Sequence, residues 1–238
     1  MNSFESHALN EMEMWKRKRL KRAGILNRTA KKAQIKFNSV IPEKVHKMVT
    51  DSIRNMVKVT LAGSGFTSSN KVRVPETLED KEQYMKERLS FYRKAAALEG
   101  AGTGAGGIFL GMADFPLLLS IKMKYLYETA QVHGLDPKAY EERLFMLYVF
   151  QLAFSSDDHR REVFNIIDRW DEFKQKLVDL DWKVFQQEYR DYIDFVKMLQ
   201  LIPGIGAVVG AYANYGLLEE LGEAAVYAYR RRHFSSKS

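Results

Sequence analysis

The sequence of 238 residues contains no cysteine and only five histidines and five prolines. The absence of cysteine excludes disulfide frameworks, thiol catalysis and cysteine-based metal sites, and it fits a reducing compartment. The first ten residues carry Glu5 and lack a basic segment followed by an apolar run, so we expect no secretory signal. These absences together predict residence in the cytoplasm.

Catalytic motifs are also missing. The residues Gly102, Gly104 and Gly107 match a G-x-G-x-x-G spacing, but the sequence before them is typical of a helix and not of the buried strand that a dinucleotide site requires. The same run has no Lys-Ser or Lys-Thr pair for phosphate, and no G-x-S-x-G sequence offers an esterase nucleophile. We therefore expect a non-enzymatic protein without a cofactor.

Metal ligands are sparse in the same way. No two histidines form an H-x-x-x-H pair. The densest group of potential ligands is Asp157, Asp158 and His159, and His133 with Asp136 is a second. Such short polar turns are commonly solvated helix caps, so these five residues are weak metal candidates and no metal is expected.

Two stretches rich in glycine and alanine, residues 101–121 and 198–218, are nearly free of charge in an otherwise highly charged chain. Each is close to the roughly 20 residues that a helix needs to cross a bilayer. Small residues allow helices to pack closely, either in a membrane or in a protein core. Their intermediate hydrophobicity favours a peripheral or partly inserted hairpin over one that spans.

The glycines of each stretch recur at helical spacing, which places them on one smooth face of a helix. Asp114 continues the first face, Pro116 predicts a kink or helix boundary beside it, and Asn214 lies in the second stretch. We predict an antiparallel pair of glycine-rich helices with Asp114 and Asn214 close in the seam; alternatively, each polar side chain bonds within its own neighbourhood. The close-packing glycines are Gly100, Gly104, Gly107, Gly111, Gly206 and Gly210.

Positive charge is concentrated toward the N-terminus. Residues 1–98 hold 21 Lys plus Arg against 10 Asp plus Glu, a net charge of +11, whereas residues 122–197 hold 12 against 15, a net charge of −3. A basic run beside an aromatic residue could lie on an anionic membrane surface or could be a solvated helix face. No nucleic-acid motif follows it, so no nucleic-acid partner is expected. The run consists of Lys16, Arg17, Lys18, Arg19, Lys21 and Arg22.

The hydrophobic periodicity predicts an all-α protein, because no useful period-2 alternation occurs. Pro42 can open an amphipathic helix that ends near Gly63. We divide the chain into a basic helical arm (1–66), a connecting loop (67–78) and a helical bundle (79–238). The bundle is expected to form around the two glycine-rich helices, near 100–126 and 203–229.

The motifs that carry these features resemble those of the EcsC protein family. The similar segments are 111–116 (GMADFP), 133–136 (HGLD) and 202–211 (IPGIGAVVGA), and the likeness extends to the Trp15 region and to residues 41–46 (IPEKVH). Bacterial family genes can accompany those of an ABC transporter, and no catalytic residues are established for the family. The resemblance therefore implies a membrane-associated accessory protein that can be linked to an ABC transporter.

We expect this protein on the cytoplasmic side of the membrane, in contact with anionic lipid. Two other classes stay open from the sequence alone. One is a soluble cytoplasmic protein that binds a lipid or small molecule in the helical bundle, with a cavity beside Asp114. The other is a lipid-acting hydrolase, which would need His133, Asp136 and His159 to converge near Asp114.

Overall fold

The computed structural model describes residues 2–21, 43–63, 72, 74–104, 115–174, 185, 187 and 206–237. The regular secondary structure of these residues is all helical, without a strand, which confirms the all-α prediction. The helices are α1 (Ser3–Lys21), α3 (Glu43–Ala62), α4 (Leu78–Gly104), α6 (Phe115–Val132), α7 (Tyr140–Phe154), α8 (Asp157–Asp168), α9 (Trp170–Phe173) and α11 (Gly206–Ser235).

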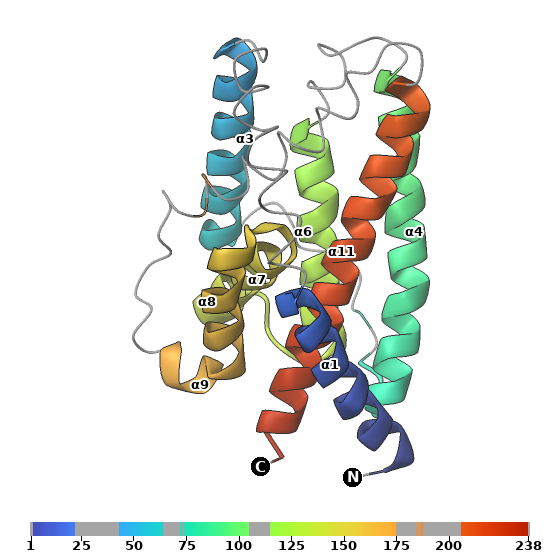
Figure 1. Ribbon diagram of the computed structural model, residues 1–238, viewed down its shortest axis with the longest axis vertical. Coiled ribbons are helices and arrows are strands. Elements are labelled where there is room, and N and C mark those ends of the chain that lie inside the picture. The colour runs from blue at the N-terminus through green and yellow to red at the C-terminus, as the bar shows by residue number, and fades with distance from the viewer. Residues whose placement is uncertain are drawn as a thin grey trace.

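The long helices α4, α6 and α11 form the upright frame of an elongated bundle (Figure 1). α4 runs from the end that holds both chain termini to the opposite end, and α6 and α11 run back. The face between α4 and α11 is especially close at Gly222, where an added Cβ would lie 2.4 Å from Leu89 Cδ2. The helix that packs along α11 is therefore α4, and its contact includes a glycine outside the predicted small-residue stretches.

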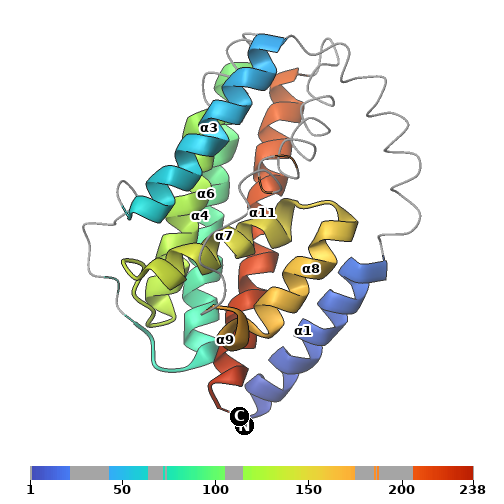
Figure 2. The same cartoon turned by 90° about the vertical axis from the view of Figure 1, so that its left-hand side faces the viewer.

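The core is centred on α7, which is buried on all sides from Leu144 to Phe154. A helix that is apolar around its whole circumference is stable only when other elements surround it. α3 covers one side, where the Tyr127 hydroxyl of α6 donates a hydrogen bond to the Thr60 carbonyl (3.3 Å). α1 and α8 lie side by side over α11 on the other side (Figure 2). The described parts of the 1–66 segment thus pack against the rest of the bundle.

Local signals explain the helix ends. Asn2 and Glu5 cap α1 reciprocally, with the Glu5 amide donating to Asn2 Oδ1 (2.8 Å) and the Asn2 amide to Glu5 Oε2 (3.1 Å). Thr77 caps α4 by accepting a hydrogen bond from the Asp80 amide (3.1 Å). α4 thus begins at Leu78, inside the segment 67–78 that was expected to be a loop. The amphipathic helix expected to end near Gly63 is α3, whose last residue is Ala62.

The structure describes the first glycine-rich stretch only at its two ends, in α4 and α6. α4 ends at Gly104 and α6 begins at Phe115, one residue before Pro116. A proline is accommodated in the first helical turn, where its missing N–H costs no hydrogen bond. The predicted kink or boundary beside Pro116 and the helix expected near 100–126 both stay predictions, because residues 105–114 lie outside the described residues.

The C-terminal end of α6 has a glycine with a clear conformational role. Gly134 has a φ of +79°, its amide donates to the Gln131 carbonyl (2.9 Å), and the Leu135 amide donates to the Ala130 carbonyl (2.9 Å). This pair of bonds is a Schellman motif, in which a left-handed residue reverses the chain after a helix. The similarity segment 133–136 thus contains a helix stop.

Candidate functional site

Charge is segregated along three of the long helices, α4, α6 and α11, whereas α3 has its charged N-terminal half at the end remote from the termini (Figure 1). At the end remote from the termini, residues 206–218 of α11 and 115–121 of α6 include no Asp, Glu, Lys or Arg, and residues 95–104 of α4 include only Glu99. The three segments gather at the same end in both views (Figures 1 and 2). The opposite halves of the same helices are densely charged. We call these three segments the charge-poor end.

Large apolar side chains are exposed at and near this end. Leu98 of α4 is 75% exposed, and Phe91, Leu117 and Tyr215 are also exposed. Arg93 lies at the border of the charged half, where its guanidinium stacks 3.7 Å from the Tyr215 ring centroid and pairs with Glu219 (3.2 Å). Exposed apolar groups on several converging helices make a candidate contact surface for lipid or for an apolar partner.

The predicted polar pair falls largely outside the described residues. Asp114, Gly107 and Gly111 lie outside them, and of Asn214 only the backbone, in α11, is described. Pairing of Asp114 with Asn214 therefore stays a prediction. The other close-packing glycines lie in the helices of the charge-poor end: Gly100 and Gly104 end α4, and Gly206 and Gly210 begin α11.

The basic run of α1 is divided between ion pairs and solvent. Lys16 pairs with Asp168 of α8, and Arg19 pairs with Glu223 of α11 (3.1 Å). Arg17 and Lys18 are exposed. Lys21 is described only by its backbone, and Arg22 lies outside the described residues. Two of the six cations thus hold α1 on the bundle, and two others face solvent.

Trp15 anchors α1 on the same surface. Its indole N–H donates to Glu223 Oε2 (2.9 Å), and its ring packs against Tyr227 at 5.2 Å and Phe164 at 5.9 Å between centroids. Asp168 also accepts a hydrogen bond from the Tyr227 hydroxyl. Burial, reinforced by Asp168, raises the pKa of Tyr227, which keeps this hydroxyl a donor. The Trp15 region is therefore a packing site for α1 as well as part of the similarity.

The metal candidates do not form a cluster in the part of the chain that the structure describes, where no group of three or more potential ligands could hold an ion. His133 stacks on the Tyr229 ring at 4.8 Å, and burial lowers its pKa to about 3. His159 lies between Gln151 (3.3 Å) and Glu162 (3.2 Å). Asp136 is exposed, and its Oδ1 accepts a hydrogen bond from a backbone amide two residues later. For Asp157 and Asp158 only the helix backbone is described.

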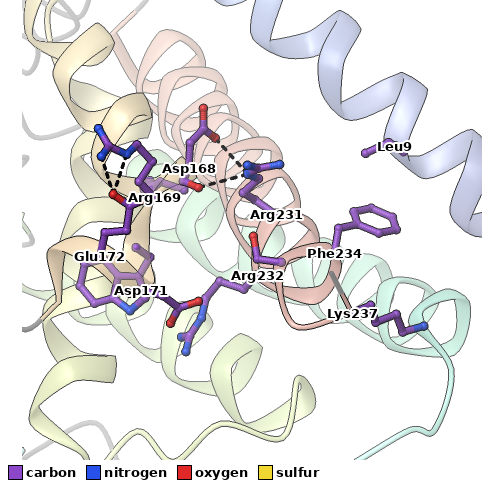
Figure 3. A pocket seen from close by; sticks show the side chains of 12 residues that line it. Leu9, Asp168, Arg169, Asp171, Glu172, Arg231, Arg232, Phe234 and Lys237 are labelled. Carbon is purple, nitrogen blue, oxygen red and sulfur yellow. Dashed lines mark hydrogen bonds and ion pairs between the residues drawn. The ribbon is translucent and has the colours of Figure 1, made fainter.

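A groove of about 920 Å³ lies beside the C-terminal part of α11, bordered by α1, α8 and α9 (Figure 3). Its charged side chains are engaged in ion pairs: Arg231 lies 3.6 Å from Asp168, and Arg169 contacts Glu172. Arg232, which also lines it, pairs with Glu142 of α7. The groove thus combines cations and anions that neutralise one another, an arrangement suited to holding α8 and α11 together.

A buried lysine is one feature of the bundle that the sequence analysis missed. Lys122 of α6 is fully buried, and its Nζ lies 4.2 Å from the Phe154 ring centroid and 5.8 Å from that of Phe150. Burial lowers its pKa to about 7, against an attraction to Glu220 that raises it. Lys122 and Lys124, which interrupt the apolar residues 115–121 and 125–127, were the available signal.

A second missed feature is a pair of buried charge clusters. Glu128 of α6 accepts hydrogen bonds from the hydroxyls of Tyr84 (3.1 Å) and Tyr92 (2.9 Å) and pairs with Arg88 (2.6 Å). Arg230 of α11 makes two hydrogen bonds of 2.6 Å to Glu82 of α4. These charges fix the lower halves of α4, α6 and α11 and are typical of structural networks, since each partner is another protein group.

The described helices also bear on membrane insertion. None of them combines the length and the apolar character required to cross a bilayer.

Comparisons with known proteins agree over nearly the whole chain. Residues 6–234 match the model of the EcsC protein family. Protein EcsC of Bacillus subtilis (strain 168) is 49% identical over 224 residues, which cover 94% of each chain. The protein named Uncharacterized protein YdbA, from the same strain, is 32% identical over 142 residues, which cover 58% of this chain and 52% of that protein. No solved structure matches. The chain belongs to the EcsC protein family.

Proposed function

We propose that this protein is a non-enzymatic, membrane-associated accessory protein that attaches to the cytoplasmic side of the membrane by its charge-poor end. The observation that carries the proposal is the segregation of charge along α4, α6 and α11, with Leu98, Leu117 and Tyr215 exposed at or near the charge-poor end. Exposed apolar side chains gain free energy when they enter the boundary between headgroups and acyl chains. Water-facing charges at the opposite end would stay in solution.

The dimensions favour partial insertion. At a rise of 1.5 Å per residue, residues 206–218 of α11 extend about 20 Å and residues 115–121 of α6 about 10 Å. A hydrocarbon core of about 30 Å is too thick for these segments to cross, but one leaflet can accommodate them. Arg17 and Lys18 are exposed on α1, which lies in the half of the bundle that holds the chain termini, so attachment by the charge-poor end does not bring them to the membrane surface (Figure 1).

Action beside an ABC transporter is the finer part of the proposal, and it rests on membership of the EcsC family. Small-residue helix faces at Gly206 and Gly210 suit contact with another apolar helix, because they allow a close approach of backbones. In this proposal the charge-poor end meets both lipid and transporter, and the charged end stays available to other contacts. The ion pairs Arg88–Glu128 and Arg230–Glu82 support a structural and not a catalytic role, because their charges bind one another.

Flotation with lipid vesicles tests the proposal. The variants Leu98→Glu and Leu117→Glu place a carboxylate at the charge-poor end, and Met14→Glu, at a methionine that is 61% exposed on α1, is the matched control. Loss of a leucine side chain from an apolar environment costs about 1.5–3 kcal/mol, so each test variant should bind vesicles roughly 10- to 100-fold more weakly. Met14→Glu should bind like the parent protein. Equal binding by all three variants would contradict attachment through this end.

A further inference from the structure

A second groove, of about 820 Å³, lies between α1 and α4 with α11 as its floor. α1 and α4 begin at the same end of the molecule and diverge toward the middle (Figure 1). The groove follows α1 from Phe4 to Trp15, α4 from Glu79 to Arg93, and α11 from Glu219 to Arg230. It is separate from the charge-poor end, because its border on α11 is the first charged layer of that helix.

The floor of this groove is apolar. Partly exposed side chains of all three helices contribute, among them Phe4, Trp15, Leu89 and Val226. Met12 and Met85 lie deeper, where both are nearly fully buried. Methionine side chains are flexible and polarisable, so a floor that includes them adapts to an apolar ligand.

The edges of the groove are acidic although the protein as a whole carries a net charge of +7. Among the charged lining residues that are exposed, five are carboxylates and Lys86 is the single Lys or Arg. Arg93 and the buried Arg230 also line the groove and pair with its carboxylates. The exposed carboxylates are Glu11, Glu79, Asp80, Glu219 and Glu223.

We infer that this groove binds a basic amphipathic helix of a partner protein. An apolar floor between charged edges is the usual receptor for such a helix, whose apolar face fills the groove while its polar edges meet the rims. The lining residues extend about 16 Å on α1 and α11 and about 21 Å on α4, the length of a helix of roughly 11–14 residues. A helix about 10 Å wide and half embedded over 16 Å fills roughly 630 Å³, which this groove accommodates.

The negative charge on the edges of the groove determines which class of partner can bind. Lys and Arg side chains on both edges of the ligand helix would face Glu79 on α4, Glu11 on α1 and Glu219 on α11. Opposite charges across an interface steer encounter and suppress wrong partners. Anionic lipid and nucleic acid would be repelled by the same carboxylates. The inference is independent of membrane attachment, and it is tested without lipid.

The probe is a fluorescein-labelled peptide of about 14 residues made of leucine and lysine in helical amphipathic order, with a leucine–glutamate peptide of the same pattern as the charge control. Binding is measured by fluorescence anisotropy at two salt concentrations with the full chain. We expect the basic peptide to bind, its affinity to fall with added salt, and the acidic peptide not to bind.

Variants localise the binding. Glu79→Gln combined with Glu219→Gln removes two rim carboxylates, and Glu87→Gln combined with Glu162→Gln removes two exposed carboxylates outside the groove. Loss of two surface ion pairs should weaken binding about 3- to 10-fold in the first double variant and leave the second unchanged. Circular dichroism checks that both variants stay folded. The same affinity in both variants, binding of the acidic peptide, or no binding of the basic peptide would each overturn the inference.

Discussion

Arg230 holds the charged end of the bundle together, and its removal is predicted to destabilise the fold strongly. The Arg230 side chain is only 9% exposed and makes a bidentate ion pair with Glu82, which is 15% exposed. It also bonds Glu11 (3.0 Å) and the Ala8 carbonyl (3.1 Å), so one side chain of α11 joins α1 and α4. Burial opposes ionisation, but the hydrogen bonds and charges of Glu82 and Glu11 raise the pKa of Arg230 overall.

The expected loss of stability depends on which charge stays buried without a partner after the substitution. Arg230→Met strands the Glu82 carboxylate in a largely buried position, and removal of one partner of a buried pair costs about 3–5 kcal/mol. For a chain of this size 1 kcal/mol corresponds to roughly 2–4 °C in the midpoint of thermal unfolding, so we expect a loss on the order of 10 °C. The double variant Arg230→Met/Glu82→Met removes both charges and should recover most of that loss.

A double-mutant cycle on urea unfolding measures the coupling between the two side chains. We expect a coupling free energy of at least about 2 kcal/mol, because the two groups are in direct contact. The control is Arg169→Met, since Arg169 forms an exposed pair with Glu172 and its loss should change stability by less than about 1 kcal/mol. If Arg230→Met is no more harmful than Arg169→Met, the assignment of a structural role to the buried cluster is wrong.

Three further predictions concern single positions. Hydrogen bonds from Lys237, His233 and the Asn2 backbone, in that order of size, lower the pKa of Glu5 from 4.5 to about 2. The ionised Glu5 therefore contributes stability above pH 4.5 that is lost as the pH falls toward 2. In Glu5→Gln, the stability measured by circular dichroism should depend less on pH between 4.5 and 2. Burial lowers the pKa of Lys122 from 10.5 to about 7, so the unfolded chain binds the extra proton between these values and stability rises with pH across them. Lys122→Met should therefore raise the free energy of unfolding by about 1–4 kcal/mol at pH 7 and by less at pH 10. An equal increase at both pH values, measured by urea unfolding, would contradict the buried-lysine argument. Gly134→Ala places a side chain on a residue in the left-handed conformation and should lower the free energy of unfolding by about 1–2 kcal/mol in the same assay. An unchanged free energy of unfolding would show that the backbone at the end of α6 is not constrained to this conformation.

The sequence was sufficient for the helical class and for the end of one helix because these depend on local chemistry. The apolar period of α3 and its end before Gly63 both follow from residues within one or two helical turns. Family membership was also accessible, since the resembling segments are contiguous in the chain.

Contacts between residues far apart in the sequence could not be predicted in this way. That α11 packs along α4 depends on Gly222 meeting Leu89, and Gly222 belongs to no visible stripe. The inward pairing of Lys16 and Arg19 depends on Asp168 and Glu223, which are more than 150 positions away in sequence. A charge count of α1 alone therefore overstates the charge that solvent or lipid can meet.

The depth of the charge-poor end in a bilayer tests the central claim most directly. Because the chain has no cysteine, Leu98→Cys, Leu117→Cys and the control Met14→Cys each provide a single attachment point for an environment-sensitive fluorophore. With anionic vesicles we predict a blue shift and quenching by acyl-chain nitroxides at positions 98 and 117, and neither effect at position 14. Labels at 98 and 117 that stay as water-exposed as the label at 14 would contradict membrane attachment through this end.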